Sequence, residues 1–124
     1  MNKVVLITGG ARGIGSAIAL ELAKHGYDIV INYLTSKQPA KKSQYHVRCL
    51  TICADVSDVD QVNIMVSEVE EKMGGVDILI NNAAVDLSNL FHLKNAEEFK
   101  RTLDVNVVGA FNCSKRVYKH MLDQ

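Results

Sequence analysis

The sequence lacks the features that would point to a membrane, nucleic-acid or disulfide-rich protein. No apolar run reaches the length of a signal-peptide core or a membrane span. The 14 basic and 14 acidic residues balance without long runs of one sign, so no broad field favours nucleic acid or anionic membranes. The three cysteines are an odd number, which argues against a disulfide framework. We therefore expect a cytoplasmic globular protein that binds small molecules.

The cysteines also carry no metal or redox signature. Cys49, Cys53 and Cys113 form no CxxC pair and have no clustered histidines near them. Cys49 and Cys53 would share one face of a strand about 13 Å apart, which is too far for a disulfide bridge. We interpret all three as core thiols rather than metal ligands or redox partners, and expect no metal site.

Strand and helix patterns alternate along the chain. Apolar runs predict strands at residues 4–7, 28–33, 49–54 and 76–80. A helix with Ile14, Ile18 and Leu22 on its buried side starts at Gly13 and stops at Gly26. A short helix is expected within residues 35–46, which contain the only proline.

Two further helices follow the third and fourth strands. One ends at the glycine pair of residues 74–75, and Ser57 is its predicted N-cap with Asp60 as capping partner. The last helix is expected from about residue 96 to the C-terminus. Its predicted apolar stripe consists of Phe99, Leu103, Ala110, Val117 and Met121.

This alternation predicts an α/β fold with a parallel, doubly wound sheet of the Rossmann type. Residues 1–124 account for one dinucleotide-binding domain with strand order 3-2-1-4, which is incomplete at its C-terminus relative to a six-stranded fold. Strand four then lies at an edge with the apolar character of a central strand. Free edge groups invite another chain, so we expect self-association through this strand or the long final helix.

A glycine-rich turn joins the first strand to its helix. The stretch TGGARGIG occupies residues 8–15 and follows the apolar run VVLI. Backbone amides at a helix start have no intrahelical acceptor, and the helix dipole adds about half a positive charge there. Gly9 would allow the tight turn, Gly13 the approach of a pyrophosphate, and Gly15 close packing of the helix on the strand. The context favours dinucleotide binding, and a purely structural turn is the alternative.

Four motifs occur in the order found in one enzyme family. The glycine spacing is G-x-x-x-G-x-G, Asp55 and Val56 follow the third strand, NNAA at residues 81–84 follows the fourth, and Asn106 lies within DVNVVG. With these motifs the whole chain resembles the short-chain dehydrogenase/reductase family, and its glycine turn is similar to that of the 3-oxoacyl-carrier-protein reductases. The resemblance implies a nicotinamide cofactor and a carbonyl or alcohol substrate.

The resemblance also implies where the cofactor lies. The glycine turn would line the phosphates, Asp55 and Val56 would bond the adenine edge, and the NNAA segment would pass beside the adenine-side ribose. The family motif ends in glycine where this chain has Ala84, which is expected to narrow the room beside the ribose. The expected cofactor-binding residues are Gly9, Arg12, Gly13, Ile14, Gly15, Asn32, Asp55, Val56, Asn82, Ala83 and Ala84.

The tip of the second strand indicates which cofactor is preferred. An NAD site usually carries an acidic side chain about 20 residues beyond the glycines, and NYLTSK at residues 32–37 contains none. A 2′-phosphate would meet Arg12, small hydroxyls and Lys37, so we expect NADP, with NAD as the second choice. The alternative is that Arg12 and Lys37 are solvated loop charges.

The family's chemistry points to one residue of this chain. Hydride moves between nicotinamide C4 and the substrate carbon, while a tyrosine assisted by a lysine passes the proton. Asn106 matches the family asparagine that kinks the long helix and organises a water in the proton relay; the alternative is a buried amide bonded to its own helix. Tyr118 and Ser114 are interpreted as ordinary helix positions. The catalytic serine and the Tyr-x-x-x-Lys motif are expected to lie beyond this chain.

Two functions fit these observations. The first is the N-terminal portion of an NADP-dependent carbonyl reductase, without turnover on its own. The second is a non-catalytic nucleotide-binding or interaction module. Both predict nucleotide binding, so catalysis distinguishes them.

Overall fold

A parallel sheet organises the computed structural model, which describes residues 2–35, 45–85 and 90–124. Within these ranges the strand order is β3-β2-β1-β4, as predicted. The strands are β1 (Val4–Ile7), β2 (Asp28–Tyr33), β3 (Cys49–Cys53) and β4 (Ile78–Ile80). Because the sheet is parallel, the carboxyl ends of all four strands lie at one edge. The short helix predicted within residues 35–46 falls largely outside the described residues.

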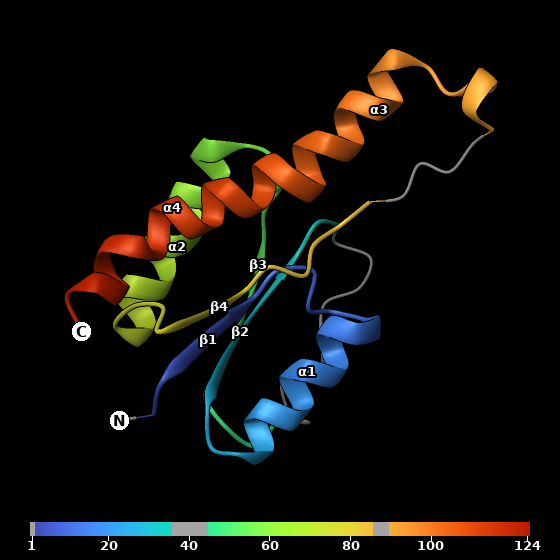
Figure 1. Cartoon of the computed structure of the whole chain (residues 1–124). Helices are drawn as coiled ribbons and strands as arrows, with labels where there is room; N and C mark the ends of the chain where they lie inside the picture. The colour runs from blue at the N-terminus through green and yellow to red at the C-terminus, as the bar shows by residue number, and fades with distance from the viewer. Residues whose placement is uncertain (1, 36–44, 86–89) are drawn as a thin grey trace.

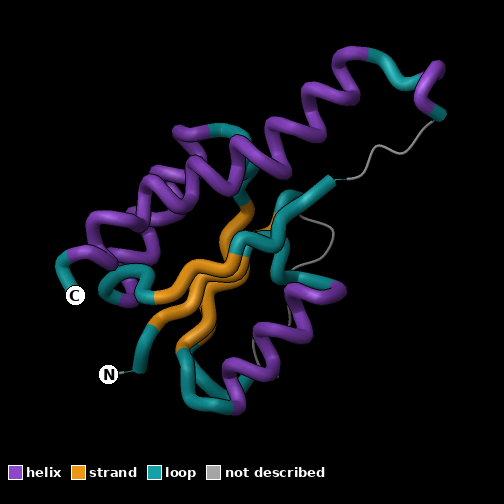
Figure 2. The backbone as a smooth tube through the Cα atoms, in the orientation of Figure 1, coloured by secondary structure: helices purple, strands orange, loops and turns teal. Residues whose placement is uncertain are grey.

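Helices cover both faces of this sheet (Figure 1, Figure 2). Helix α1 (Gly13–Lys24) packs on one face, and α2 (Val59–Met73) and α4 (Gly109–Leu122) pack on the other. Helix α3 (Ala96–Leu103) continues into α4 through a π-helical turn, Asp104–Val108. A single 3-10 turn, η2 (Phe91–Leu93), precedes α3. The sheet with helices on both faces confirms the predicted Rossmann fold.

The central strand contributes alternate residues to two cores. Val5 and Ile7 pack in the cluster beneath α1, whereas Val4 and Leu6 pack in the cluster beneath α2 and α4. All four side chains are buried. This explains the continuous apolar run, since a strand covered on both faces has no polar side.

Helix α1 buries a different stripe from the predicted one. Gly15, Ala19 and Ala23 face the sheet, while Ile14 is 75% exposed. Ile18 and Leu22 are half-buried at the edge of the contact. The prediction followed the largest apolar residues, but the smallest ones face the strands because they let the helix approach closely.

The N-cap of α2 also differs from the prediction. Asp58, not Ser57, caps the helix, and its carboxylate accepts hydrogen bonds from the backbone amides of Asp60 and Gln61 at 2.9 and 3.3 Å. The Ser57 hydroxyl instead donates to Asp55 Oδ1 at 2.7 Å. Ser57 and Asp58 could both cap this helix. Because Asp58 is the cap, the Ser57 hydroxyl can bond to Asp55 in the site described below.

The apolar stripe of the last helix is confirmed only in part: Val117 is buried and Met121 packs against the core. Val105, Gly109, Cys113 and Val117 are its buried residues, at four-residue spacing. The predicted Phe99 and Leu103 are exposed, because α3 projects beyond the sheet edge (Figure 1). Val105, inside the π-helical turn, is therefore the first buried residue of this helical segment.

The three thiols occupy different environments, and none of them forms a disulfide. Burial raises the pKa of Cys113 to about 11, as expected of a core thiol. Cys53 is exposed and donates to the Leu34 carbonyl at 3.3 Å, so the prediction of a core position is wrong for this residue. In the described ranges, no helix combines the length and apolar character needed to cross a bilayer.

The packing on α2 yields a first prediction. Met65 is fully buried in the core, whereas its neighbour Ile64 is exposed. Met65→Ala should lower the free energy of unfolding by about 2–5 kcal/mol because it leaves a cavity. Ile64→Ala, the matched control, should change it by less than about 0.5 kcal/mol. Urea denaturation of both variants checks this, and equal losses would contradict the assigned orientation of α2.

Candidate cofactor site

Thr8 joins the glycine turn to the loop after β4. Its buried hydroxyl accepts hydrogen bonds from the backbone amides of Asn82 and Ala83 at 3.0 and 2.9 Å. The same hydroxyl donates to the Ile80 carbonyl at 3.4 Å. Asn82 adds a bond from its side-chain amide to the Gly9 carbonyl at 3.0 Å. The ends of the first and fourth strands are therefore held together.

Asn32 holds the same turn from the other side. Its side-chain oxygen accepts from the Gly9 amide at 3.3 Å, and its backbone carbonyl accepts from the Gly10 amide at 3.0 Å. Its side-chain nitrogen donates to the Ala54 carbonyl at 3.0 Å. Asn32 is buried, so its amide is committed to the walls of the site rather than to a ligand.

The next backbone amides are open. In the described part of the chain, the amides of residues 12–15 have no protein acceptor, and the first bonded amide in α1 is that of Ser16, to the Arg12 carbonyl at 3.3 Å. No side chain caps this helix start, and its first turn carries no acidic residue. Four donors without a protein acceptor and the positive end of the helix dipole therefore lie together here.

The glycines keep this region open in different ways. Gly9 and Gly13 have φ of +62° and +59°, which strains any other residue. A Cβ at Gly13 would meet no atom within 4 Å, whereas a Cβ at Gly15 would lie 2.5 Å from the Asn82 side-chain nitrogen and 2.6 Å from the Gly9 carbonyl. Gly15 therefore permits close packing of the turn on the loop after β4, rather than only of helix on strand as predicted.

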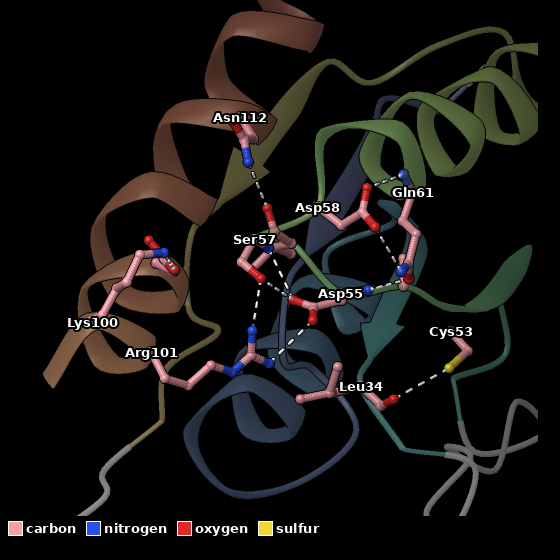
Figure 3. A network of polar contacts seen from close by, with 12 residues as sticks. Leu34, Cys53, Asp55, Ser57, Asp58, Gln61, Lys100, Arg101 and Asn112 are labelled. Carbon is pink, nitrogen blue, oxygen red and sulfur yellow. Dashed lines mark hydrogen bonds and ion pairs between the residues drawn. The ribbon is translucent and has the colours of Figure 1, made fainter. Parts of the chain in front are cut away.

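A charged cluster follows β3 (Figure 3). Asp55 Oδ1 accepts from the Ser57 amide and hydroxyl at 3.0 and 2.7 Å, and Asp55 Oδ2 accepts from Arg101 at 3.1 Å. Burial raises the pKa of Asp55, but the hydrogen bonds from Ser57 and the Arg101 charge lower that pKa more, to a net value below its usual range. Asp55 is therefore an ionised acceptor at neutral pH.

These elements surround a cavity of about 390 Å³ at the carboxyl ends of the strands. Most of the residues predicted to bind the cofactor line it. They are Gly9, Arg12, Gly13, Asn32, Asp55, Val56, Asn82, Ala83 and Ala84. The strand-two tip, with Tyr33, Leu34 and Thr35, shares the cavity with Arg12. The predicted Lys37 lies outside the described residues.

Three predicted residues do not line this cavity. Gly15 is buried behind the turn, and Ile14 is exposed beside it. Asn106 reaches the cavity wall indirectly, because its side chain accepts from the Val85 amide at 2.8 Å and donates to the Val85 carbonyl at 3.1 Å. Asn106 is exposed and bonds a loop across the site, so the alternative of a buried amide bonded to its own helix is wrong.

Sequence reasoning missed several lining residues and one motif. Ala54, Val85 and Val105 line the cavity. Each is adjacent to a predicted site residue or motif, and this proximity in the sequence could have indicated them.

Tyr33 is followed four residues later by Lys37, the Tyr-x-x-x-Lys spacing. Tyr33 ends β2 rather than following a fifth strand, so this match does not occupy the family's position.

Comparisons with known proteins agree with this geometry. The short chain dehydrogenase family profile matches residues 3–124. The chain is 37% identical to the 3-oxoacyl-[acyl-carrier-protein] reductase FabG of Staphylococcus aureus, covering 100% of this chain and 52% of that protein. It is 34% identical to the acetoacetyl-CoA reductase of Paracoccus denitrificans, covering 100% of this chain and 51% of that protein.

Solved structures show the same similarity. The NADP-bound structure of ElxO superimposes with a TM-score of 0.87 and 34% identity, over 99% of this chain and 52% of that one. A blue fluorescent protein from a metagenomic library, in complex with NADPH, gives a TM-score of 0.85 and 31% identity, over 96% and 51%. The chain spans about half the length of these relatives.

The sheet order, the covered faces and the glycine turn define a Rossmann-fold protein. Within that class, the family match over nearly the whole chain is decisive. The chain belongs to the short-chain dehydrogenase family.

The Thr8 contacts generate a second prediction. Thr8→Val keeps the shape but leaves the amides of Asn82 and Ala83 without their acceptor, so it should cost about 2 kcal/mol of unfolding free energy. Thr8→Ser keeps the hydroxyl and should cost less, about 1 kcal/mol for the lost methyl group. Chemical denaturation measures both variants. A serine variant as unstable as the valine variant would show that the hydroxyl does not hold this edge together.

Proposed function

We propose that this chain binds NADPH as part of a reductase that acts on carbonyl compounds. The observation that carries the proposal is the set of amides at residues 12–15 that have no acceptor in the described part of the protein, together with Arg12 and Gly13 in the lining of a cavity at the carboxyl ends of parallel strands. Open α/β sheets bind nucleotides at this edge. The named relatives are reductases, and two similar structures hold NADP or NADPH.

The pyrophosphate would occupy the start of α1. Consecutive amides without protein acceptors and a helix dipole both favour a diphosphate over a neutral ligand. Gly13 allows close approach, because its surface faces open space. The amides of Gly9 and Gly10 take no part, since Asn32 already accepts from both.

The 2′-phosphate would lie between Arg12 and the tip of β2. Arg12 is exposed and lines the same cavity as Tyr33, Leu34 and Thr35. In the described residues of this tip no carboxylate takes the place that would bond a free 2′-hydroxyl. A guanidinium and a hydroxyl suit a phosphate, so NADP is preferred to NAD.

The adenine would lie against the loop after β3. Asp55 supplies an ionised acceptor, and Val56 lines the same wall. Asn82, Ala83 and Ala84 form the opposite wall, beside the ribose. All these residues come from loops at the carboxyl ends of β3 and β4.

The substrate class follows from the relatives. FabG and acetoacetyl-CoA reductase both act on 3-oxoacyl thioesters by their names, so we propose a 3-oxoacyl thioester as substrate. The bound cofactor would supply the hydride. This chain's contribution is to orient the cofactor and, through Asn106, to fix the Val85 loop and serve the proton relay.

Catalysis distinguishes the reductase from a binding module. A binding module should bind NADPH without consuming it, whereas a reductase should oxidise NADPH when an acetoacetyl thioester is present. NADPH absorbance measures this oxidation. Turnover that is lost in Asn106→Ala would assign catalysis to the chain itself.

The cofactor preference gives a third prediction. Arg12→Ala should weaken NADPH binding by about tenfold, the scale of a hydrogen bond between charged groups, and leave NADH binding unchanged. Lys24→Ala, at the far end of α1, is the control and should change neither. Fluorescence titrations with both cofactors measure this. Equal weakening of NADPH and NADH by Arg12→Ala would remove the 2′-phosphate assignment.

We also propose that the chain self-associates through its long helix. Val107, Phe111, Tyr118 and Leu122 expose apolar surface along α4 and the turn before it. Phe111→Asp should weaken association at least about fivefold in sedimentation equilibrium. Ile64→Asp changes an equally exposed apolar residue of α2 and should have no effect. A wild-type chain that stays monomeric at every concentration would contradict the proposal.

A further inference from the structure

Arg101 connects the projecting helix α3 to the loop after β3 (Figure 3). Its guanidinium donates to the Ser57 hydroxyl at 2.8 Å and to Asp55 Oδ2 at 3.1 Å. The Ser57 hydroxyl in turn donates to Asp55 Oδ1 at 2.7 Å. The three side chains therefore close a ring, and the carboxylate of Asp55 is held at both oxygens.

Nearly all the polar groups of Asp55 are committed by this arrangement. Its amide donates to the Gln61 side chain at 2.8 Å, and its carbonyl accepts from the Asp58 amide at 3.0 Å. Oδ1 accepts twice from Ser57, while Oδ2 accepts once from Arg101. Since each carboxylate oxygen can accept two hydrogen bonds, Oδ2 keeps one acceptor position.

That free position belongs to a residue of the cavity wall. Asp55 lines the cavity and Arg101 does not, so the arginine contacts the carboxylate without being part of the cavity lining. Val56 is fixed next to it, because its carbonyl accepts from the Asn112 side chain at 2.9 Å. In the described part of the chain the Val56 amide has no protein acceptor. The acceptor position of Asp55 Oδ2 and the donor of the Val56 amide thus belong to adjacent residues that are both held in place.

We propose that Arg101 is a positioning residue of the adenine subsite, which holds Asp55 so that the site selects a 6-aminopurine over a 6-oxopurine. The proposal rests on the proposed function, since it assumes that the cavity takes the adenine end of NADPH. Arg101 contacts no ligand. It acts by fixing the direction of the Asp55 acceptor.

The chemistry of the two purines explains the selection. Adenine presents an amino group, a donor, beside N1, an acceptor, and this pair complements Asp55 Oδ2 and the Val56 amide. Hypoxanthine presents a carbonyl oxygen beside N1–H, so acceptor meets acceptor and donor meets donor. A site with fixed polar groups discriminates in this way because the wrong partner leaves them unpaired.

Arg101 and Asp55 are partly exposed, with side-chain exposures of 38% and 24%. An ion pair of this kind has a modest effect. Without Arg101 the carboxylate keeps the two bonds from Ser57 but loses the partner of Oδ2. The free acceptor position of Oδ2 is then less well oriented. The preference for the 6-aminopurine over the 6-oxopurine should therefore decrease but not disappear.

The test compares two cofactors that differ only in the purine, NADPH and nicotinamide hypoxanthine dinucleotide phosphate, in its reduced form. The wild-type chain should prefer NADPH. Arg101→Ala should lower that preference by about threefold, as expected of a partly exposed ion pair, mainly through weaker NADPH binding. Arg101→Lys should restore part of it, since a lysine replaces the charge but not the two-point contact.

Lys100→Ala is the matched control on α3, because among the described residues Lys100 pairs with Asp104 alone, at 2.9 Å and one turn further along the helix. It should leave both affinities unchanged. If Arg101→Ala unfolds the chain, Ser57→Ala breaks the same ring and should lower the preference in the same direction. Equal weakening of both cofactors, or no change, would overturn the role of Arg101. A wild-type chain that binds neither cofactor would overturn the proposed function as well.

Discussion

The backbone amides at the start of α1 are the constraint around which the site is organised. A helix must begin with unpaired amides, and in the described residues nothing in the protein accepts from those of residues 12–15. The neighbouring amides of Gly9 and Gly10 are bonded to Asn32. The protein therefore satisfies the donors that shape the turn and leaves the amides at the helix start without a partner, with Arg12 and Gly13 in the cavity lining.

The long final helix sets the positions of the cavity walls. Asn106 fixes Val85, and Asn112 fixes Val56, each by side-chain bonds to backbone groups. Arg101 holds Asp55 from the same helical segment. Gly109 lets α4 approach, because a Cβ there would lie 2.5 Å from the Val56 side chain. One continuous helical segment thus contacts the loops after β3 and β4, and support of this kind holds site residues in place.

The parts of the fold that depend on local patterns could be predicted from the sequence. The first two strands, the stops at Gly26 and Gly74 and the strand order follow from apolar runs, glycine chemistry and topology. The buried side of α1 could not, because close packing there favours Ala19 and Ala23 over larger residues. The exposure of Phe99 and Leu103 could not either, because α3 projects beyond the sheet edge (Figure 1) and apolar spacing gives no sign of this.

In the site, too, local motifs could be predicted from the sequence and contacts between distant residues could not. Motif positions indicated which loops line the cavity, whereas the bonds of Asn106 to Val85 and of Arg101 to Asp55 join residues 21 and 46 positions apart. The most direct test of the account is an amide NMR titration of the chain with NADPH. The account predicts that the largest shift changes occur at residues 12–15 and that Gly9 and Gly10 change little. Binding that leaves the amides of residues 12–15 unchanged would contradict it.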